Sequence, residues 1–244
     1  MHNVVVTGGS RGLGLAIARR LAACGYGAIA IARSGNGKLT DAIKEAEASR
    51  PGSLRFVPFD LGDIDKIPDL VQSLRKQFGP VYGLVNNAAL GTDGHLGIMK
   101  NSQIEQLIRI NTLSPIVLSK YIVRSMMSEG VGRIVNVTSI IGFTGYSGLS
   151  VYGATKASMI GFTRSLAREV GRLGVNVNAI APGFMETDMT EGLQGEQRER
   201  VARRTALRRL PETDEVADAV EYLLSDRARS ITGTVLTVDA GATA

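Results

Sequence analysis

Short runs of β-branched and other apolar residues alternate with longer helix-like segments along the whole chain, and this alternation constrains the fold more than any other feature. The runs are nearly continuous in apolar residues, as expected for strands covered on both faces. They lie at residues 3–7, 28–32, 54–59, 81–87, 132–139, 175–182 and 234–240, and the helix-like segments lie at about 12–24, 38–49, 63–78, 100–128, 150–174, 191–206 and 213–225. With right-handed crossovers, this order predicts an α/β protein with a doubly wound, parallel, seven-stranded sheet and helices on both faces.

The chain has 244 residues, which is long for one domain and short for two. Because no linker, low-complexity tract or repeat interrupts the alternation, we expect a single domain over residues 1–244. One cysteine and two histidines are too few for a disulfide framework or a cysteine–histidine metal site, so we expect no metal. Neither a signal peptide nor an apolar run of about 18 residues is present, which predicts a cytoplasmic protein outside the membrane.

The first expected strand runs into the turn TGGSRGLG, residues 7–14, and an apolar periodic helix follows. Such a turn lets the backbone approach a pyrophosphate, and the helix start presents unpaired N–H groups and a positive dipole end to it. The three glycines depart from the common G-x-G-x-x-G spacing. A tight turn without a ligand explains one or two glycines here but not three, so we predict a Rossmann-type dinucleotide site. The residues predicted to line it are Gly8, Ser10, Arg11, Gly12, Leu13 and Gly14.

The residue at the end of the second strand discriminates between NAD and NADP. A site selective for NAD would place an acidic residue there, on the ribose 2′-hydroxyl. This chain has Arg33, nineteen residues after Gly14. A guanidinium binds a 2′-phosphate through charge-assisted hydrogen bonds, and Arg11 can approach the same phosphate from the other side. We therefore predict NADP(H) as the cofactor.

Tyr152 and Lys156 stand four residues apart in the helix-like stretch GLSVYGATKASMIGF, so they project from one face of a helix. A nearby ammonium stabilises a phenolate, so we expect Lys156 to lower the pKa of Tyr152 from its usual value near 10. Tyr152 could then exchange a proton with a substrate oxygen while a nicotinamide carries a hydride. Ser139, at the end of the strand at 132–139, would face the same crevice and could bond a substrate carbonyl. Thr138 is a rival for that role by chemistry alone.

Together these motifs resemble the short-chain dehydrogenase/reductase family, and the resemblance covers nearly the whole chain. The turn T-G-x-x-x-G-x-G matches the family's cofactor turn, and Y-x-x-x-K, beginning thirteen residues after Ser139, matches its catalytic pair and selects Ser139 over Thr138. The resemblance implies that Asn111 holds a water linking Lys156 to solvent. The alternative is an asparagine that bonds its own backbone within the helix.

The resemblance also implies further cofactor contacts. Asp60 would lie near the adenine, although an N-cap or loop role would also explain an aspartate there. In the loop after the fourth strand, Ala89 replaces the last glycine of the family's N-N-A-G motif, and an alanine is strained where the backbone needs a positive φ. The full set of implied contacts is Asp60 and Leu61 beside the adenine, Asn87, Ala88 and Ala89 in that loop, and Pro182, Gly183, Met185 and Thr187 beside the nicotinamide.

Within the family, residues 151–190 most resemble the 3-oxoacyl-[acyl-carrier-protein] reductases. This implies NADPH-dependent reduction of a 3-oxoacyl thioester in fatty acid synthesis, with the acidic acyl carrier protein as a candidate partner. A reductase of another ketone or secondary alcohol, such as a sugar, steroid or diol, would use the same catalytic residues. A non-enzymatic cofactor sensor would typically lack the tyrosine or lysine. Small and apolar residues around the helix at 150–174 predict that another subunit covers it, and the resemblance implies a homotetramer.

The charge pattern leaves the carrier open. The formal net charge is +5, which suits an acidic partner and is also common on ordinary surfaces. The subfamily's two basic docking positions, expected to flank the active-site entrance, fall on Gly130 and Leu173, with Arg172 one residue out of register. Arg164, Arg168 and Arg172, spaced four apart, could form a different basic stripe. Arginines also recur at 198, 200, 203, 204, 208 and 209, where we favour a solvated helix face paired with Glu196 and Glu199 over a carrier site. Nucleic-acid binding is not expected, because no aromatic residues are interleaved.

Overall fold

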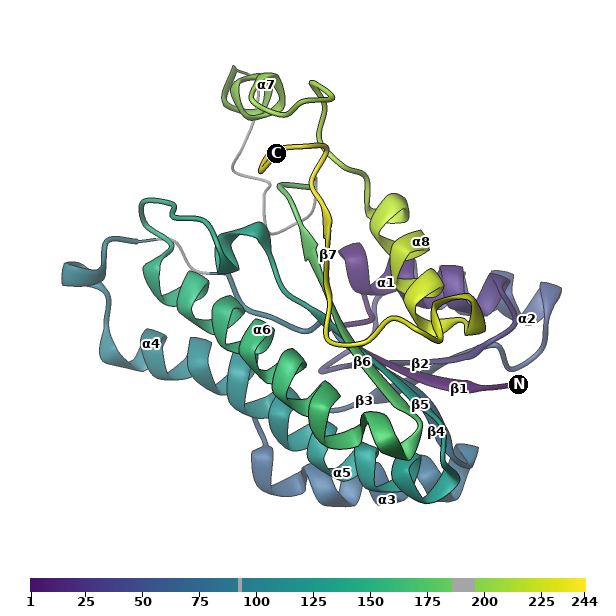
Figure 1. Ribbon diagram of the computed structural model, residues 1–244. Helices are drawn as coiled ribbons and strands as arrows, with labels where there is room; N and C mark the ends of the chain where they lie inside the picture. The colour runs from purple at the N-terminus through teal and green to yellow at the C-terminus, as the bar shows by residue number, and fades with distance from the viewer. Residues whose placement is uncertain (92–93, 186–195) are drawn as a thin grey trace.

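The computed structural model describes residues 1–91, 94–185 and 196–244. Seven parallel strands form one sheet in the order β3-β2-β1-β4-β5-β6-β7 (Figure 1). They are β1 (Asn3–Thr7), β2 (Gly27–Ala32), β3 (Leu54–Pro58), β4 (Val81–Asn86), β5 (Gly132–Val137), β6 (Val175–Pro182) and β7 (Val235–Val238). The chain changes direction across the sheet between β1 and β4, which opens a crevice at the carboxyl ends of the strands. The predicted doubly wound α/β fold is confirmed.

Helices cover both faces of the sheet (Figure 1). One face carries α1 (Gly12–Ala23), α2 (Gly37–Ser49) and α8 (Thr213–Leu224), and the other carries α3 (Ile67–Phe78), α5 (Ser114–Glu129) and α6 (Ser150–Val170). The strand β1 explains the continuous apolar runs, because Val4 and Val6 pack in one of these cores and Val5 packs in the other. The helix α4 (Asn101–Ile108) precedes α5, and α7 (Glu196–Arg203) stands apart, beyond the carboxyl ends of the strands. Over the described residues, no helix is both long and apolar enough to cross a bilayer.

Three of the expected helices are subdivided. The segment at 100–128 consists of α4, a π-helical turn over Arg109–Leu113, and α5. Pro115 has no N–H to donate to the carbonyl of residue 111, so the regular α-helical pattern cannot continue there. The segment at 63–78 begins with a 3₁₀ turn, Ile64–Lys66, and the one at 150–174 ends with another, Gly171–Leu173.

Several expected strands are shorter than their apolar runs. The runs at 132–139 and 234–240 form strands only over Gly132–Val137 and Val235–Val238, because their last residues turn away at the edge of the crevice. Ser139 instead begins a short 3₁₀ turn, Ile140–Gly142, and its hydroxyl oxygen caps that turn. We call the edge of the sheet where the strands end the carboxyl edge, and the opposite one the amino edge.

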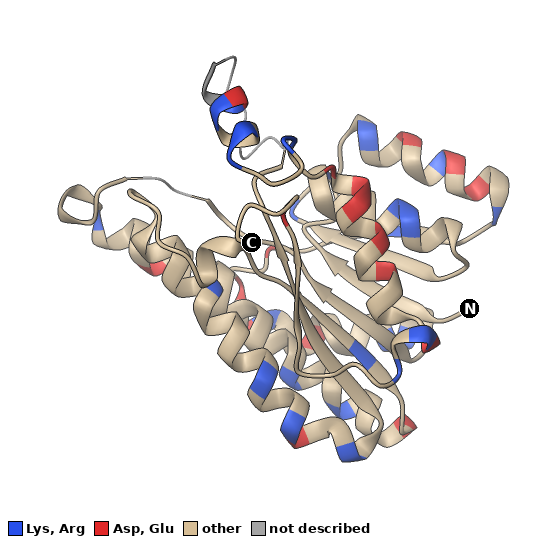
Figure 2. Cartoon of the chain, turned by 45° about the horizontal axis from the view of Figure 1, so that its top comes forward, with Lys and Arg blue, Asp and Glu red and all other residues tan. Residues whose placement is uncertain are grey.

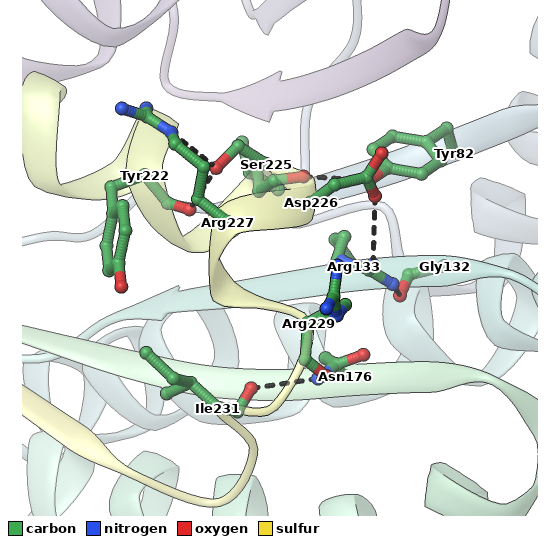
Figure 3. A network of polar contacts seen from close by, with 11 residues as sticks. Tyr82, Gly132, Arg133, Asn176, Tyr222, Ser225, Asp226, Arg227, Arg229 and Ile231 are labelled. Atoms are coloured by element: carbon green, nitrogen blue, oxygen red, sulfur yellow. Dashed lines mark hydrogen bonds and ion pairs between the residues drawn. The ribbon is translucent and has the colours of Figure 1, made fainter.

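A polar cluster lies at the amino edge around Arg133, the second residue of β5 (Figure 3). Arg133 is 6% exposed. One terminal nitrogen donates to the carbonyl of Gly132 at 2.9 Å, and the other lies 3.5 Å from a carboxylate oxygen of Asp226. The guanidinium carbon lies 5.7 Å from the centroid of the Tyr82 ring. The buried Nε has no hydrogen-bond partner, so this cation is only partly compensated.

Candidate active site

The turn between β1 and α1 brings backbone N–H groups to the crevice. Gly8 and Gly12 adopt φ values of +66° and +51°, in the left-handed region that favours glycine. A Cβ on Gly14 would collide with the carbonyl oxygen of Gly8, so no side chain fits at that position. No side chain caps the start of α1, which leaves its first N–H groups and positive dipole end for an anion. This glycine cradle at an uncapped helix start fits a dinucleotide pyrophosphate.

Thr7 joins this turn to the loop after β4. It is 2% exposed, and its hydroxyl oxygen accepts hydrogen bonds from the backbone N–H groups of Asn87 (2.9 Å) and Ala88 (3.0 Å). The side-chain amide of Asn87 donates to the carbonyl of Thr7 at 2.9 Å. Ala89, in the same loop, is not among the described non-glycine residues with a positive φ. The alanine is therefore accommodated without the strain that a left-handed backbone would impose.

The residues predicted to meet the adenosine half of the cofactor follow the neighbouring strands. Arg33 is exposed just past β2, and Arg11 is exposed at the start of α1. Asp60 and Leu61 lie in the loop after β3, where Leu61 is buried and a carboxylate oxygen of Asp60 accepts from the N–H of Gly62 at 2.8 Å. This side of the crevice thus combines exposed cations with an apolar residue.

Tyr152, Lys156 and Ser139 meet at the carboxyl end of β5. Ser139 lies beside Tyr152, close enough to act on the pKa of its phenol. Lys156 Nζ lies 5.6 Å from the centroid of the Tyr152 ring and donates to the carbonyl of Val137 at 2.9 Å. The rival Thr138 is buried, and its hydroxyl donates to a backbone carbonyl of β6 at 2.8 Å. The geometry therefore unites a phenol, a hydroxyl and a buried amine, with Ser139 rather than Thr138 beside the phenol.

Burial sets the pKa of both ionisable groups. It raises the pKa of Tyr152 to about 12, with the hydrogen bond from Ser139 acting in the opposite direction. It lowers the pKa of Lys156 to about 8. The prediction that the pKa of Tyr152 lies below its usual value is therefore wrong for the chain on its own, because burial disfavours the charged phenolate.

The π-helical turn connects three parts of the site. Asn111 is 2% exposed; its side chain accepts from the N–H of Leu90 at 2.8 Å and donates to the carbonyl of Leu90 at 2.9 Å and to the hydroxyl of Thr155 at 3.2 Å. These bonds leave its own helix, unlike the alternative considered from sequence. Arg109 Nε donates to the carbonyl of Gly62 at 2.9 Å, in the loop after β3. The turn therefore ties both cofactor loops to α6.

Comparisons with known proteins agree with this geometry. A family model described as enoyl-(acyl carrier protein) reductase matches residues 8–243. The chain is 41% identical over 237 residues to the 3-oxoacyl-[acyl-carrier-protein] reductase FabG of Escherichia coli, covering 97% of this chain and 95% of that one. Among solved structures, a short-chain dehydrogenase from Burkholderia cenocepacia in complex with NADP is 32% identical, with a TM-score of 0.91 and coverage of 100% and 98%. The chain belongs to the short-chain dehydrogenase/reductase family. A second structure, a blue fluorescent protein from a metagenomic library in complex with NADPH, is 34% identical over 100% of this chain and 98% of that one, with a TM-score of 0.92.

The residues predicted to lie beside the nicotinamide follow β6 in this short-chain dehydrogenase/reductase. Pro182 ends β6, and a Cβ on Gly183 would lie 2.9 Å from the Cα of Asp239, so that the loop packs directly on the backbone after β7. Met185 packs against the core formed with α1 and α8. Thr187 lies outside the described residues.

The two docking positions expected beside the entrance lie elsewhere in the short-chain dehydrogenase/reductase fold. Gly130 and Leu173 directly precede the starts of β5 and β6, and the N–H of Gly132 bonds the carbonyl of Gly174 at 3.2 Å between them. Both positions are therefore at the amino edge, whereas Tyr152 is at the carboxyl edge. The expectation that they flank the entrance is wrong within one chain.

The arginines of α7 and the following segment lie on the surface at the carboxyl side (Figure 2). Arg203 pairs with Glu199 at 2.6 Å, and Arg209 pairs with Glu215 through two bonds of 2.6 and 2.7 Å. Pairing through Glu199 is thus confirmed, and the side chain of Glu196 lies outside the described residues. Among the described residues, no three His, Cys, Asp or Glu side chains are grouped to hold a metal ion.

Sequence reasoning missed several residues that shape this site. Thr7 begins the glycine motif and could have been found from its place at the end of β1. Arg109 and Thr155 gave no signal, because their roles depend on contacts with residues 47 and 44 positions away. Asp239 stood in the terminal stretch that resembles the family, without an assigned role.

Proposed function

We propose that the protein is an NADPH-dependent 3-oxoacyl-thioester reductase of fatty acid synthesis, with one domain over residues 1–244. The observation that carries the proposal is that Tyr152, Ser139 and Lys156 meet at the same crevice as the glycine cradle between β1 and α1. The identity to the E. coli 3-oxoacyl-[acyl-carrier-protein] reductase supports the substrate class, and the NADP and NADPH complexes of the structural relatives support the cofactor.

In the reaction we propose, Ser139 donates a hydrogen bond to the substrate carbonyl oxygen and orients it. The nicotinamide, when bound, supplies the hydride that reaches the carbonyl carbon. Tyr152 gives its phenolic proton to the oxygen, which completes the alcohol. Lys156, close to the ring, stabilises the phenolate that remains until a proton returns from solvent, and Asn111 supports that return.

The cofactor is proposed to lie across the carboxyl edge, with its pyrophosphate on the cradle and its 2′-phosphate between Arg11 and Arg33. Asp60 and Leu61 would meet the adenine. The loop from Asn87 to Ala89 would lie beneath the nicotinamide ribose, and Pro182, Gly183, Met185 and Thr187 would lie beside the ring. The exposed arginine pair supports NADPH over NADH, because a guanidinium binds a phosphate dianion that an acidic residue would repel.

We further propose a cytoplasmic homotetramer that receives its substrate on acyl carrier protein or coenzyme A. The positive net charge supports an acidic carrier. Exposed Ile108 and Leu113, beside α6, support a covering subunit on that side. Light scattering at micromolar concentration tests the assembly: we expect the mass of a tetramer, and the mass of a monomer would disprove it.

The deciding experiment measures NADPH oxidation with acetoacetyl thioesters of acyl carrier protein and of coenzyme A, beside sugar, steroid and diol carbonyls. We expect the thioesters to be the best substrates by kcat/KM, and NADPH to exceed NADH. Activity confined to the other carbonyls would favour the alternative reductase. Cofactor binding without turnover of any compound would favour a sensor, although that class typically lacks Tyr152 or Lys156.

A further inference from the structure

The last residues of the chain fold into a turn around one buried carboxylate. Asp239 follows β7 and is 7% exposed. One of its side-chain oxygens accepts from the N–H of Gly241 at 2.9 Å, and the other accepts from the N–H of Thr243 at 2.9 Å and from its hydroxyl at 2.7 Å. Its backbone carbonyl accepts from the N–H of Ala242 at 3.1 Å. A single aspartate thus organises the terminal turn, residues 239–243.

The terminal turn holds the segment that follows α7. The N–H of Leu207 donates to the carbonyl of Ala240 at 3.0 Å, and the N–H of Ala206 donates to the carbonyl of Gly241 at 3.3 Å. The two backbones are in close contact, since a Cβ on Gly241 would lie 2.6 Å from the Cβ of Ala206. The terminal turn also forms the surface on which Gly183 packs. Two stretches of the carboxyl edge therefore depend on the same carboxylate.

The segment that follows α7 is also held at its other end, near Arg209. Arg209 is held by the two bonds to Glu215, at the start of α8, and its backbone N–H donates to the hydroxyl of Thr205 at 3.2 Å. Between these anchors the side chain of Leu207 is 62% exposed. A large apolar side chain held outward on the side of the sheet where the strands end is suited to contact a bound substrate.

We propose that Asp239 is a positioning residue: by folding the terminal turn it holds residues 206–207 at the substrate side of the crevice. It touches neither the reacting atoms nor the catalytic side chains. Its effect is to present Leu207 at a fixed place, so that less ordering is needed when the acyl substrate binds. This inference rests on the proposed function for its substrate, and on the hydrogen bonds of the terminal turn for its mechanism.

A matched pair at position 243 provides the sharpest test. Thr243→Val keeps the shape and the backbone N–H but removes the hydroxyl that donates to Asp239, whereas Thr243→Ser keeps that hydroxyl. Asp239→Asn is the stronger variant, because in either orientation its amide NH₂ must face a donor, that of Gly241 or the two of Thr243. Asp218→Asn is the control for loss of a carboxylate, because Asp218 lies on α8 and forms an exposed ion pair with Arg20 of α1.

Hydrogen exchange of the amides at 206–207 and steady-state kinetics with acetoacetyl thioester and NADPH are measured on each intact variant. For Asp239→Asn and Thr243→Val we expect about tenfold faster exchange at 206–207 and about a tenfold higher KM for the thioester, with kcat changed less than about threefold. Thr243→Ser and Asp218→Asn should behave as the unmodified protein.

A variant whose Tm falls while its exchange rate at 206–207 and its KM both stay unchanged would show that Asp239 is merely structural, and would overturn the proposal. A raised KM without faster exchange at 206–207 would overturn it too. Should the unmodified protein reduce no thioester, the proposed function fails, and the exchange data alone still decide whether Asp239 holds the segment.

Discussion

The two edges of the sheet are built differently. At the amino edge, a glycine with a positive φ precedes each of the strands β2 to β7; these are Gly25, Gly52, Gly79, Gly130, Gly174 and Gly233. Left-handed backbone at these turns is thus supplied by the residue that adopts it without strain. At the carboxyl side, Arg208 and Ala240 are the non-glycine residues with a positive φ in the described part of the chain. Local sequence and local conformation therefore agree at the amino edge, whereas at the carboxyl edge they conflict at Arg208 and Ala240.

Each edge also buries a cation, and the two are compensated differently. Arg133 at the amino edge has a carbonyl, a carboxylate and an aromatic ring around its guanidinium. Lys156 at the carboxyl edge donates a hydrogen bond to the carbonyl of Val137, and burial lowers its pKa to about 8. The buried cation whose pKa is lowered therefore lies beside the phenol at the crevice, whereas the one surrounded by several partners lies at the opposite edge of the sheet.

The largest effect should come from removing the phenol at the carboxyl edge. We expect Tyr152→Phe to lower kcat by roughly 10³-fold, since the variant has no acid to protonate the carbonyl oxygen. The matched change at the amino edge, Tyr222→Phe, should leave kcat within about twofold. NADPH oxidation with an acetoacetyl thioester is the measurement. Undiminished turnover of Tyr152→Phe would contradict the role of Tyr152 as proton donor and, with it, the functional difference between the two edges.

A pH profile sharpens the contrast between the two cations. Since burial lowers the pKa of Lys156 to about 8, its ammonium form is lost as the pH rises through that value. The phenol of Tyr152, whose pKa is raised to about 12, remains protonated over the same interval. We therefore expect kcat/KM for thioester reduction to fall on the alkaline side with an apparent pKa near 8.

The residual activity of Lys156→Met provides the control, because it should lack that alkaline limb. A limb that persists in this variant would have to be assigned to another group. No acid limb is expected from the catalytic pair, because both groups are protonated below neutral pH.

At the amino edge, two substitutions of Arg133 separate its charge from its stem. Arg133→Met keeps an apolar chain against Tyr82 and removes a partly compensated buried charge, so we expect a free energy of unfolding no lower than that of the unmodified protein. Arg133→Ala also leaves a cavity, so we expect its free energy of unfolding to be about 2 kcal/mol lower. Denaturant unfolding measures both, and kcat should stay within about twofold. An equal loss in the two variants would show that the charge itself stabilises this edge.

The same division explains what could be predicted from the sequence. Strand and helix order followed from apolar runs, and the cradle, Tyr152, Lys156 and Ser139 followed from motifs whose members lie on known elements. Burial could not be read from spacing, so the direction of the Tyr152 pKa was wrong. The long helix at 100–128 hid a π turn because its apolar periodicity continues through Pro115. Contacts of Arg109 and Asp239 join loops from different strands, and only the folded sheet edge brings such loops together.

The smallest predicted effect concerns backbone strain at the carboxyl edge. Ala240 has a φ of +55°, where a Cβ is unfavourable, and the next residue, Gly241, has a φ of +76°. We expect Ala240→Gly to raise the free energy of unfolding by about 0.5 kcal/mol, because relief of the left-handed strain slightly exceeds the added entropy of the unfolded chain. Ala242→Gly, at a neighbouring residue without a positive φ, should instead lower it by a similar amount. Equal destabilisation by both glycines would show that Ala240 carries no strain, and the conflict between sequence and conformation at this edge would then rest on Arg208 alone among the described residues.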